Sequence, residues 1–169
     1  SLILKRMKRR HSRDDAIALC ERLRAARPEI SFGADIIAGF PTETQTQFEQ
    51  SLSIIDVIDI AWLHVFPYSP KLGTPAAKMP AVDGAVIKVR AAQLRAAGER
   101  ARLRHFSRRS GARDIALIEK PGFGRLADFT PVNIDRVADA QKGRQMQAGQ
   151  LRGVSLTGYG DDAMTGVLT

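Results

Sequence analysis

The pattern of apolar positions predicts a helix and then a strand near the start of the chain. Residues 13–27 carry apolar side chains at helical spacing, and Ser12 with Asp15 three positions later matches a capping box. Pro28 ends this helix, because a proline disfavours helical geometry in the residue before it. Residues 31–40 then form a near-continuous apolar run, which is typical of a strand covered on both faces.

A second helix and a second strand follow in the same order. Thr42 or Thr44 caps a helix predicted over residues 44–57, and residues 61–66 have the composition of a strand. Strand, helix and strand at this spacing imply a right-handed parallel crossover. The predicted fold class is therefore α/β, with units that form the arc of a barrel and not a closed one. Residues 2–7 are expected to be the end of a strand or a loop.

Beyond this arc the pattern changes from helical to strand-like. Residues 83–109 have a narrow apolar stripe at helical spacing, and Ser110-Gly111 marks the predicted boundary. After the boundary, glycines separate four short strand-like runs, which are residues 114–119, 126–132, 150–156 and 164–168. Many short strands with glycine turns indicate a small β-barrel. We therefore expect two domains, residues 1–110 and residues 111–169, with residues 137–147 as loop or mixed structure.

Charge is spread unevenly along the chain and suggests a polyanionic partner. The net charge is +8, and the basic excess lies in residues 1–30 and residues 85–113, which flank an acidic middle. RNA is the expected polyanion, and the alternative is a solvated helix face. No apolar run approaches the roughly 20 residues of a membrane-spanning helix, so no membrane partner is expected.

The single cysteine restricts the chemistry of the chain. Cys20 has no intrachain partner for a disulfide, which suits a reducing compartment and hence a cytoplasmic location. It lies on the apolar stripe of the first helix, where it is expected to be a small core residue. One thiolate cannot hold an iron–sulfur cluster, and no Cys/His cluster predicts a metal site. His11 and His105 lie in basic segments and are expected on the surface.

Three segments carry a family resemblance. The run DIIAGFPTET at Asp35–Thr44 resembles the D-x-I-x-G-F-P-x-E-T signature of radical S-adenosylmethionine methylthiotransferases, which thiomethylate tRNA. MKRRH at Met7–His11 and HVFPYSPKLGTPAAKM at His64–Met79 match in order. The exact form is most like the branch acting on threonylcarbamoyladenosine beside the anticodon. The resemblance covers residues 2–110 well and the remainder weakly, where the family's small RNA-binding TRAM barrel is similar.

The resemblance implies a fragment of a larger enzyme. The family's cofactors are S-adenosylmethionine and [4Fe-4S] clusters, whose cysteine motif is absent here, so their ligands would lie outside this chain. The chain would be the C-terminal part, inactive alone and without a catalytic residue of its own. Its partners would be the tRNA anticodon stem-loop and the missing N-terminal part. The alternatives are a sibling enzyme that modifies a ribosomal protein, and a non-enzymatic RNA-binding module.

The same resemblance suggests cofactor-binding residues around the Gly-Phe-Pro segment. A glycine lets backbone approach an adenosyl group, an isoleucine packs on its ring, and an arginine clamps a carboxylate. In the wider superfamily the acidic residue lies one place earlier than Glu43, and a lone strand histidine such as His64 is more often a hydrogen-bonded core residue. The expected cofactor-binding residues are Arg9, Arg10, Asp35, Ile37, Gly39, Phe40, Pro41, Glu43, His64 and Tyr68.

Basic and aromatic residues suggest where RNA binds. Arginines of the predicted long helix would contact phosphates, and aromatic residues of the predicted barrel would stack on unpaired bases. The alternative for the phenylalanines is a place in the barrel core. The expected RNA-binding residues are Lys71, Arg100, Arg104, Arg108, Arg109, Phe123 and Arg125.

Overall fold

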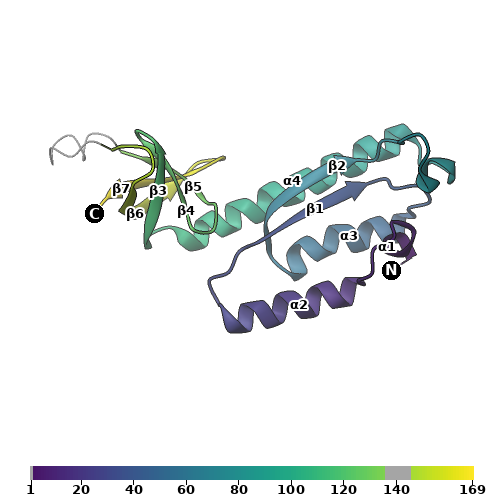
Figure 1. The fold of residues 1–169 in the computed structure, drawn as a ribbon, viewed down its shortest axis with the longest axis horizontal. Helices are drawn as coiled ribbons and strands as arrows, with labels where there is room; N and C mark the ends of the chain where they lie inside the picture. The colour runs from purple at the N-terminus through teal and green to yellow at the C-terminus, as the bar shows by residue number, and fades with distance from the viewer. Residues whose placement is uncertain (1, 136–145) are drawn as a thin grey trace. The chain divides into compact units, whose positions relative to one another are not determined.

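The computed structural model describes residues 2–135 and 146–169 (Figure 1). The chain forms two compact units, Ser1–Arg102 and Leu103–Thr169. The long helix α4 (Gly84–Arg109) begins in the first unit and ends in the second. None of the helices in the described part of the chain is both long enough and apolar enough to cross a membrane.

The first unit contains the predicted helices and strands. Its elements in chain order are α1 (Leu2–Arg6), α2 (Arg13–Ala26), β1 (Phe32–Ala38), α3 (Gln45–Val57), β2 (Ile60–Pro67), the 3₁₀ helix η1 (Pro75–Lys78) and most of α4. Ser12 and Thr44 close capping boxes with Asp15 and Gln47, so the caps begin α2 and α3 where the pattern placed them. The expectation of strand or loop at residues 2–7 is wrong, since α1 is a short helix.

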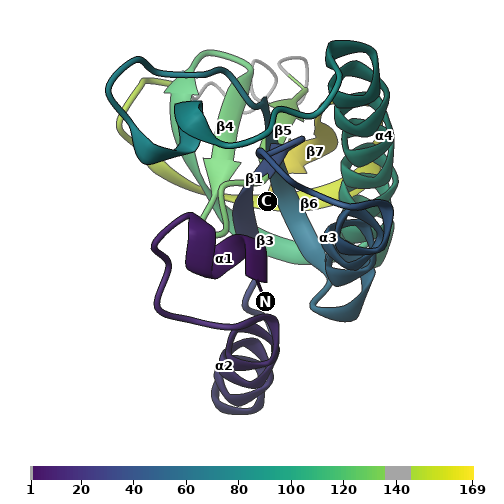
Figure 2. The ribbon, with the colours of Figure 1, turned by 90° about the vertical axis from the view of Figure 1, so that its right-hand side faces the viewer.

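β1 and β2 pair in parallel and make a two-stranded sheet with two unlike faces. Ala34, Ile36, Leu63 and Val65 pack against a core that α3 and α4 supply on one side (Figure 2). The core side chains are Ala38, Phe48, Ile55, Ile58, Ile60, Ala91, Leu94, Ala97 and Ala101. The opposite face is open, with Asp35 exposed, so the prediction of a strand covered on both faces is wrong. Cys20 is half-buried and packs on the core, as predicted.

The second unit is a closed five-stranded barrel with strand order β3-β4-β5-β7-β6. The strands are β3 (Arg113–Lys120), β4 (Phe123–Leu126), β5 (Pro131–Ile134), β6 (Leu151–Tyr159) and β7 (Met164–Leu168). Alternating residues fill the interior, including Ala116, Ile118, Val132, Val154, Leu156 and Met164. The prediction of a small β-barrel is thereby confirmed.

One predicted strand of this barrel is wrong. The run 126–132 is not one strand: β4 ends at Leu126, β5 begins at Pro131, and residues 127–130 form a turn between them, across which the Leu126 N–H donates to the Thr130 carbonyl at 2.9 Å. Phe129 adopts a left-handed backbone with φ of 66°, which no regular strand tolerates. Most of the segment 137–147, predicted as loop or mixed structure, lies outside the described residues.

A candidate ligand site at the carboxyl end of strand β1

The chain turns sharply after β1, and backbone hydrogen bonds fix the turn. Gly39 has φ of 73° and Thr42 has φ of 70°. The Glu43 N–H donates to the Phe40 carbonyl at 2.9 Å, and the Thr42 N–H donates to the Pro80 carbonyl at 3.0 Å. A side chain on Gly39 would bring its Cβ to 2.4 Å from Cγ1 of Ile87 in α4. Glycine is therefore needed here to let α4 approach the turn.

A buried ion pair supports the turn from behind. Arg90 Nη1 donates to Glu43 Oε2 at 2.9 Å and to the Glu43 carbonyl at 3.0 Å, and the Gly39 N–H donates to Glu43 Oε2 at 3.0 Å. The side chains of Arg90 and Glu43 are only 8% and 3% exposed. Burial raises the pKa of Glu43, while the Gly39 N–H and Arg90 act in the opposite direction. The guanidinium also lies over the Phe48 ring, 5.3 Å from its centroid.

The turn is covered as well as supported. Gly39, Phe40 and Pro41 are buried, and the Phe40 ring meets the Tyr68 ring edge-on at 5.4 Å. The Tyr68 N–H donates to the Ala38 carbonyl at 2.9 Å. This packing differs from the expectation that Gly39 exposes backbone to a ligand, because its open side is filled by Ile87. Glu43 also stabilises the turn, because its carboxylate accepts hydrogen bonds from the Gly39 N–H and from Arg90.

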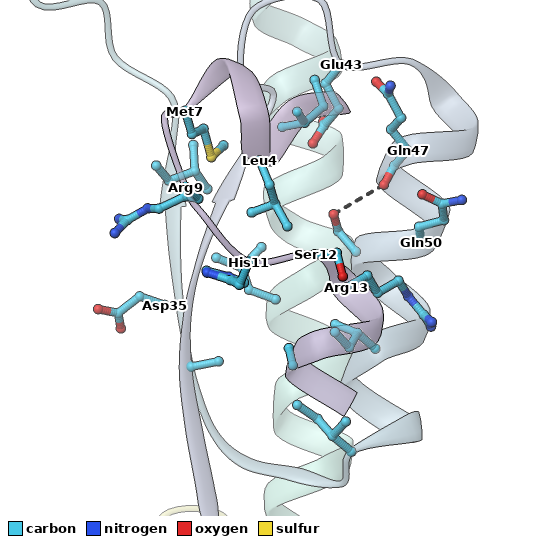
Figure 3. A pocket seen from close by; sticks show the side chains of 18 of the residues that line it. Leu4, Met7, Arg9, His11, Ser12, Arg13, Asp35, Glu43, Gln47 and Gln50 are labelled. Atoms are coloured by element: carbon cyan, nitrogen blue, oxygen red, sulfur yellow. Dashed lines mark hydrogen bonds between the residues drawn. The ribbon is translucent and has the colours of Figure 1, made fainter. Parts of the chain in front are cut away.

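A cavity of about 320 Å³ lies beside the turn, between α1, α2, β1 and α3 (Figure 3). Its wall combines a cation, acids, amides and apolar side chains, among them Met7, Arg9, Asp35, Ile37, Glu43 and Gln47. In Figure 3 the side chains of Arg9 and Asp35 point to the same side of β1. The structure therefore places Arg9, Asp35, Ile37 and Glu43 around one cavity, and their role in binding a cofactor stays a prediction. Arg10 is exposed on the loop before α2.

The open face of the sheet places a second group of predicted residues together. Asp35 in β1 lies opposite His64 in β2 in the parallel register, and both side chains are exposed. His64 is therefore not the buried core histidine that was the alternative. Trp62 and Phe66 alternate with His64 along β2, so the same face carries aromatic rings on either side of it.

The predicted RNA-binding residues separate into exposed and structural ones. Lys71, Arg100, Arg104 and Arg108 are exposed. Arg109 instead belongs to a partly buried network of the second unit, where its Nη2 donates to the Asp114 carboxylate and its Nη1 lies 3.4 Å from Asp128. Its guanidinium is thus held by acids of its own unit.

Aromatic and basic groups gather on the outside of the barrel. Lys120 Nζ and the Arg125 guanidinium lie 5.5 Å and 5.8 Å from the Phe123 ring centroid. Arg125 Nε donates to Glu119 at 2.9 Å, and its Nη1 donates to the Phe129 carbonyl at 3.2 Å. Phe123 is half-buried, and the Phe129 side chain is 72% exposed. Neither ring is among the buried residues of the barrel core, which was the alternative.

The sequence missed a buried polar network in the second unit. His105 was expected on the surface, yet it is buried, with Nε2 at 3.0 Å from Thr130 Oγ1 and 3.2 Å from Asp128 Oδ2. Burial alone would raise the pKa of Asp128, but hydrogen bonds from His105 and Thr130 and the charge of Arg109 lower it well below its ordinary value. The sequence feature that could have revealed the burial of His105 is its neighbour Phe106, a large apolar residue of α4 that is itself buried.

Metal-ligating side chains in the part of the chain that the structure describes do not gather into a candidate metal site. Among the described residues no group of three or more His, Cys, Asp and Glu side chains is placed to hold a metal ion.

The chain is similar to bacterial tRNA-modifying enzymes. It is 49% identical over 135 residues to the threonylcarbamoyladenosine tRNA methylthiotransferase of Rickettsia prowazekii, a match that covers 80% of this chain and 32% of the relative. It is 38% identical over 121 residues to the tRNA-2-methylthio-N(6)-dimethylallyladenosine synthase of Roseobacter denitrificans, covering 71% and 27%. It is also 32% identical over 172 aligned positions to the synthase of that name from Ruegeria pomeroyi, covering 98% and 38%. The chain thus spans about a third of the length of these relatives. No protein-family model matches it.

Proposed function

We propose that this chain, which belongs to the family of tRNA methylthiotransferases, is the C-terminal part of an enzyme that adds a methylthio group to threonylcarbamoyladenosine beside the anticodon. Residues 1–110 would complete a radical S-adenosylmethionine barrel, and residues 111–169 would be a TRAM-like RNA-binding barrel. The free edge of β1 supports the first assignment, since a sheet of two parallel strands is too small to stand alone. The closed five-stranded barrel supports the second.

The observation that carries the proposal is the arrangement of Arg9, Asp35 and Ile37 around one cavity beside the turn after β1. A volume of about 320 Å³ is at the lower end of the range for small-molecule sites. Its donor set fits S-adenosylmethionine, because a guanidinium suits the carboxylate of the methionyl part and an apolar side chain suits the adenine ring. Bound there, this cofactor would supply a radical when reduced by a cluster held outside the chain.

The residues of this chain would bind and orient. Arg9 would clamp the carboxylate, with Arg10 as the second cation of the loop, and Ile37 would pack on the adenine. Gly39, Phe40 and Pro41 do not line the cavity and would hold the turn beside it, where Glu43, which does line it, is fixed by Arg90. Lys71, Arg100, Arg104 and Arg108 would contact phosphates of the tRNA, and Phe123 with Arg125 would stack on unpaired bases.

Analysis of tRNA nucleosides by mass spectrometry tests the proposal. Deleting the gene that encodes this sequence should abolish the 2-methylthio derivative of threonylcarbamoyladenosine, and the intact gene should restore it. A gene segment limited to these 169 residues should not restore it. An unchanged nucleoside together with an altered ribosomal protein would instead identify the sibling activity. If the deletion changed neither the tRNA nucleosides nor the ribosomal proteins, the remaining interpretation would be a non-enzymatic RNA-binding module.

A further inference from the structure

The loop between β2 and α4, residues 68–80, is fastened at both ends to the turn after β1. The Tyr68 N–H donates to the Ala38 carbonyl at 2.9 Å, and the Pro80 carbonyl accepts from the Thr42 N–H at 3.0 Å. Figure 1 shows this loop at the end of the sheet toward which the arrow of β1 points. The loop therefore rises directly from the turn beside the candidate site.

The tip of this loop is a hydrogen-bonded turn that carries an exposed apolar side chain. The Thr74 N–H and the Thr74 hydroxyl both donate to the Lys71 carbonyl, at 3.2 Å and 2.8 Å. Gly73 has φ of 83°, as the third residue of a type II turn requires. Leu72, the second residue of the turn, is 96% exposed, more than any other large apolar side chain in the described ranges. It lies within about 15 Å of Tyr68, because four residues of chain span no more.

The composition of the loop indicates what kind of partner meets Leu72. A single exposed leucine is common on protein surfaces, but this one is held in a fixed turn close to the candidate site. Lys71 and Lys78 of the same loop are exposed as well, and residues 68–80 contain no Asp or Glu. A cationic loop with an apolar tip suits a nucleic acid better than an apolar protein surface, because the lysines attract phosphates while the leucine meets a base.

Resting on the proposed function, we propose that Leu72 is a wedge that enters the anticodon loop and takes the place of the acceptor adenosine in the base stack. An enzyme that acts on a base must reach an atom that stacking covers, so the base has to leave the stack. Apolar side chains that insert between bases unstack them in this way. Leu72 fills the gap, and Lys71 contacts a phosphate next to it. The displaced adenosine is then free to enter the site beside the turn after β1.

Fluorescence of 2-aminopurine tests the inference with the 169-residue chain. This adenine analogue is quenched by stacking, and it replaces the acceptor adenosine in an anticodon stem-loop RNA. A second RNA carries it two nucleotides away in the same loop. At saturating protein the first probe should brighten and the second should not. Leu72→Ala should reduce the brightening of the first probe at saturation at least about twofold and weaken binding about tenfold, because most of the apolar surface that fills the gap is lost.

Three further variants distinguish a wedge from other roles. Leu72→Met keeps a long apolar side chain and should retain most of the brightening. Lys71→Ala should lower the affinity and its dependence on salt, but leave the brightening at saturation unchanged. Leu19→Ala removes a leucine that is 52% exposed on α2 and should change neither the affinity nor the brightening. Because Leu72 is 96% exposed, its replacement should not disturb folding.

Three results would overturn the inference. One is failure of the unaltered chain to bind the stem-loop, and another is equal brightening of the two probes. The third is undiminished brightening at saturation with Leu72→Ala, which would indicate that Leu72 contacts a protein surface instead. The analysis of tRNA nucleosides after gene deletion does not depend on Leu72, so failure of the proposed function remains distinguishable from failure of this inference.

Discussion

Arg90 and Glu43 form an ion pair that is buried almost completely, although 47 positions separate them in the sequence. Arg90 comes from α4 and Glu43 from the turn after β1, so the pair fastens the long helix to the end of the strand. The same carboxylate accepts the Gly39 N–H, and the same guanidinium reaches the Glu43 carbonyl. These bonds hold one wall of the candidate site at a fixed distance from the helix.

Substitution Arg90→Ala should therefore be severely destabilising. It leaves the Glu43 carboxylate buried and without its cation, which typically costs about 3 to 5 kcal/mol. Urea unfolding followed by Trp62 fluorescence measures this loss in the first unit, where the tryptophan lies.

The exposed pair of Arg27 and Glu29 provides the matched control. Its N–O distance of 2.8 Å is nearly that of the buried pair, but its side chains are 64% and 62% exposed. Arg27→Ala should cost far less than Arg90→Ala, because water replaces the lost interaction. If Arg27→Ala and Arg90→Ala lowered the free energy of unfolding equally, burial would not be the reason why the ion pair at the turn stabilises the unit.

Gly39→Ala should destabilise the first unit more than Gly73→Ala does. Both glycines have positive φ, 73° and 83°, so both substitutions cost about 1 kcal/mol in backbone strain. Only at Gly39 would the new Cβ collide with Ile87, at 2.4 Å, whereas nothing lies within 4 Å at Gly73. The collision should add about 1 to 3 kcal/mol in urea unfolding, and Ile87→Ala in the same chain should relieve part of it. If the two glycine variants lost the same free energy of unfolding, α4 would be able to move away from the new Cβ without cost.

The sequence predicted the regular elements of this chain well, because the signals for them are local. Ser12 and Thr44 cap α2 and α3 with partners three residues away, and Met164–Leu168 appears as a strand in both the pattern and the structure. Local patterns failed where tertiary structure decides. Phe129 lies in an apolar run, yet that run bends into a turn in which the Leu126 N–H donates to the Thr130 carbonyl and the Phe129 N–H donates to the Leu126 carbonyl.

Sequence motifs predicted which residues lie at the candidate site, but they did not predict which contacts hold those residues in place. Motif matching brought together Arg9, Asp35 and Ile37, which the structure places at one cavity. The role of Glu43 depended on Arg90, a residue of a distant helix that no motif included. His105 was misjudged for the same reason, since its partners Asp128 and Thr130 lie in a turn beyond two strands.

The stability of the second unit should fall as the pH falls below about 4. The folded pKa of Asp128 is lowered, so the unfolded chain, with an ordinary pKa of about 3.9, takes up a proton first. The stabilisation is thus complete above that pH and lost progressively below it. Urea titrations at several pH values, followed by the methyl NMR signal of the buried Met164, measure the effect.

Asp128→Asn should flatten this dependence and lower stability at neutral pH. The substitution removes the charge that Arg109 and His105 face, while it keeps the size of the side chain. The exposed Asp161 supplies the control, since Asp161→Asn should leave both the stability and its pH dependence unchanged. An acid transition that is identical in Asp128→Asn and in the unaltered chain would show that other groups control it.

The exposed ring of Phe129 should contribute to RNA binding and not to folding. Its side chain is 72% exposed, so Phe129→Ala should change the free energy of unfolding by less than about 0.5 kcal/mol. Stacking of a base on an aromatic ring is worth about 1 to 3 kcal/mol, so affinity for a single-stranded anticodon loop should fall at least several-fold in fluorescence anisotropy. The dependence of affinity on salt should stay the same, because the ring carries no charge.

Arg125→Ala should reduce both the affinity and the salt dependence, since a cation that contacts phosphate releases counterions. Leu151→Ala is the matched control, because Leu151 is 69% exposed on the same barrel but has no ring to stack. If Leu151→Ala weakened binding as much as Phe129→Ala, the contact would be general apolar adhesion and the stacking role of Phe129 would be wrong.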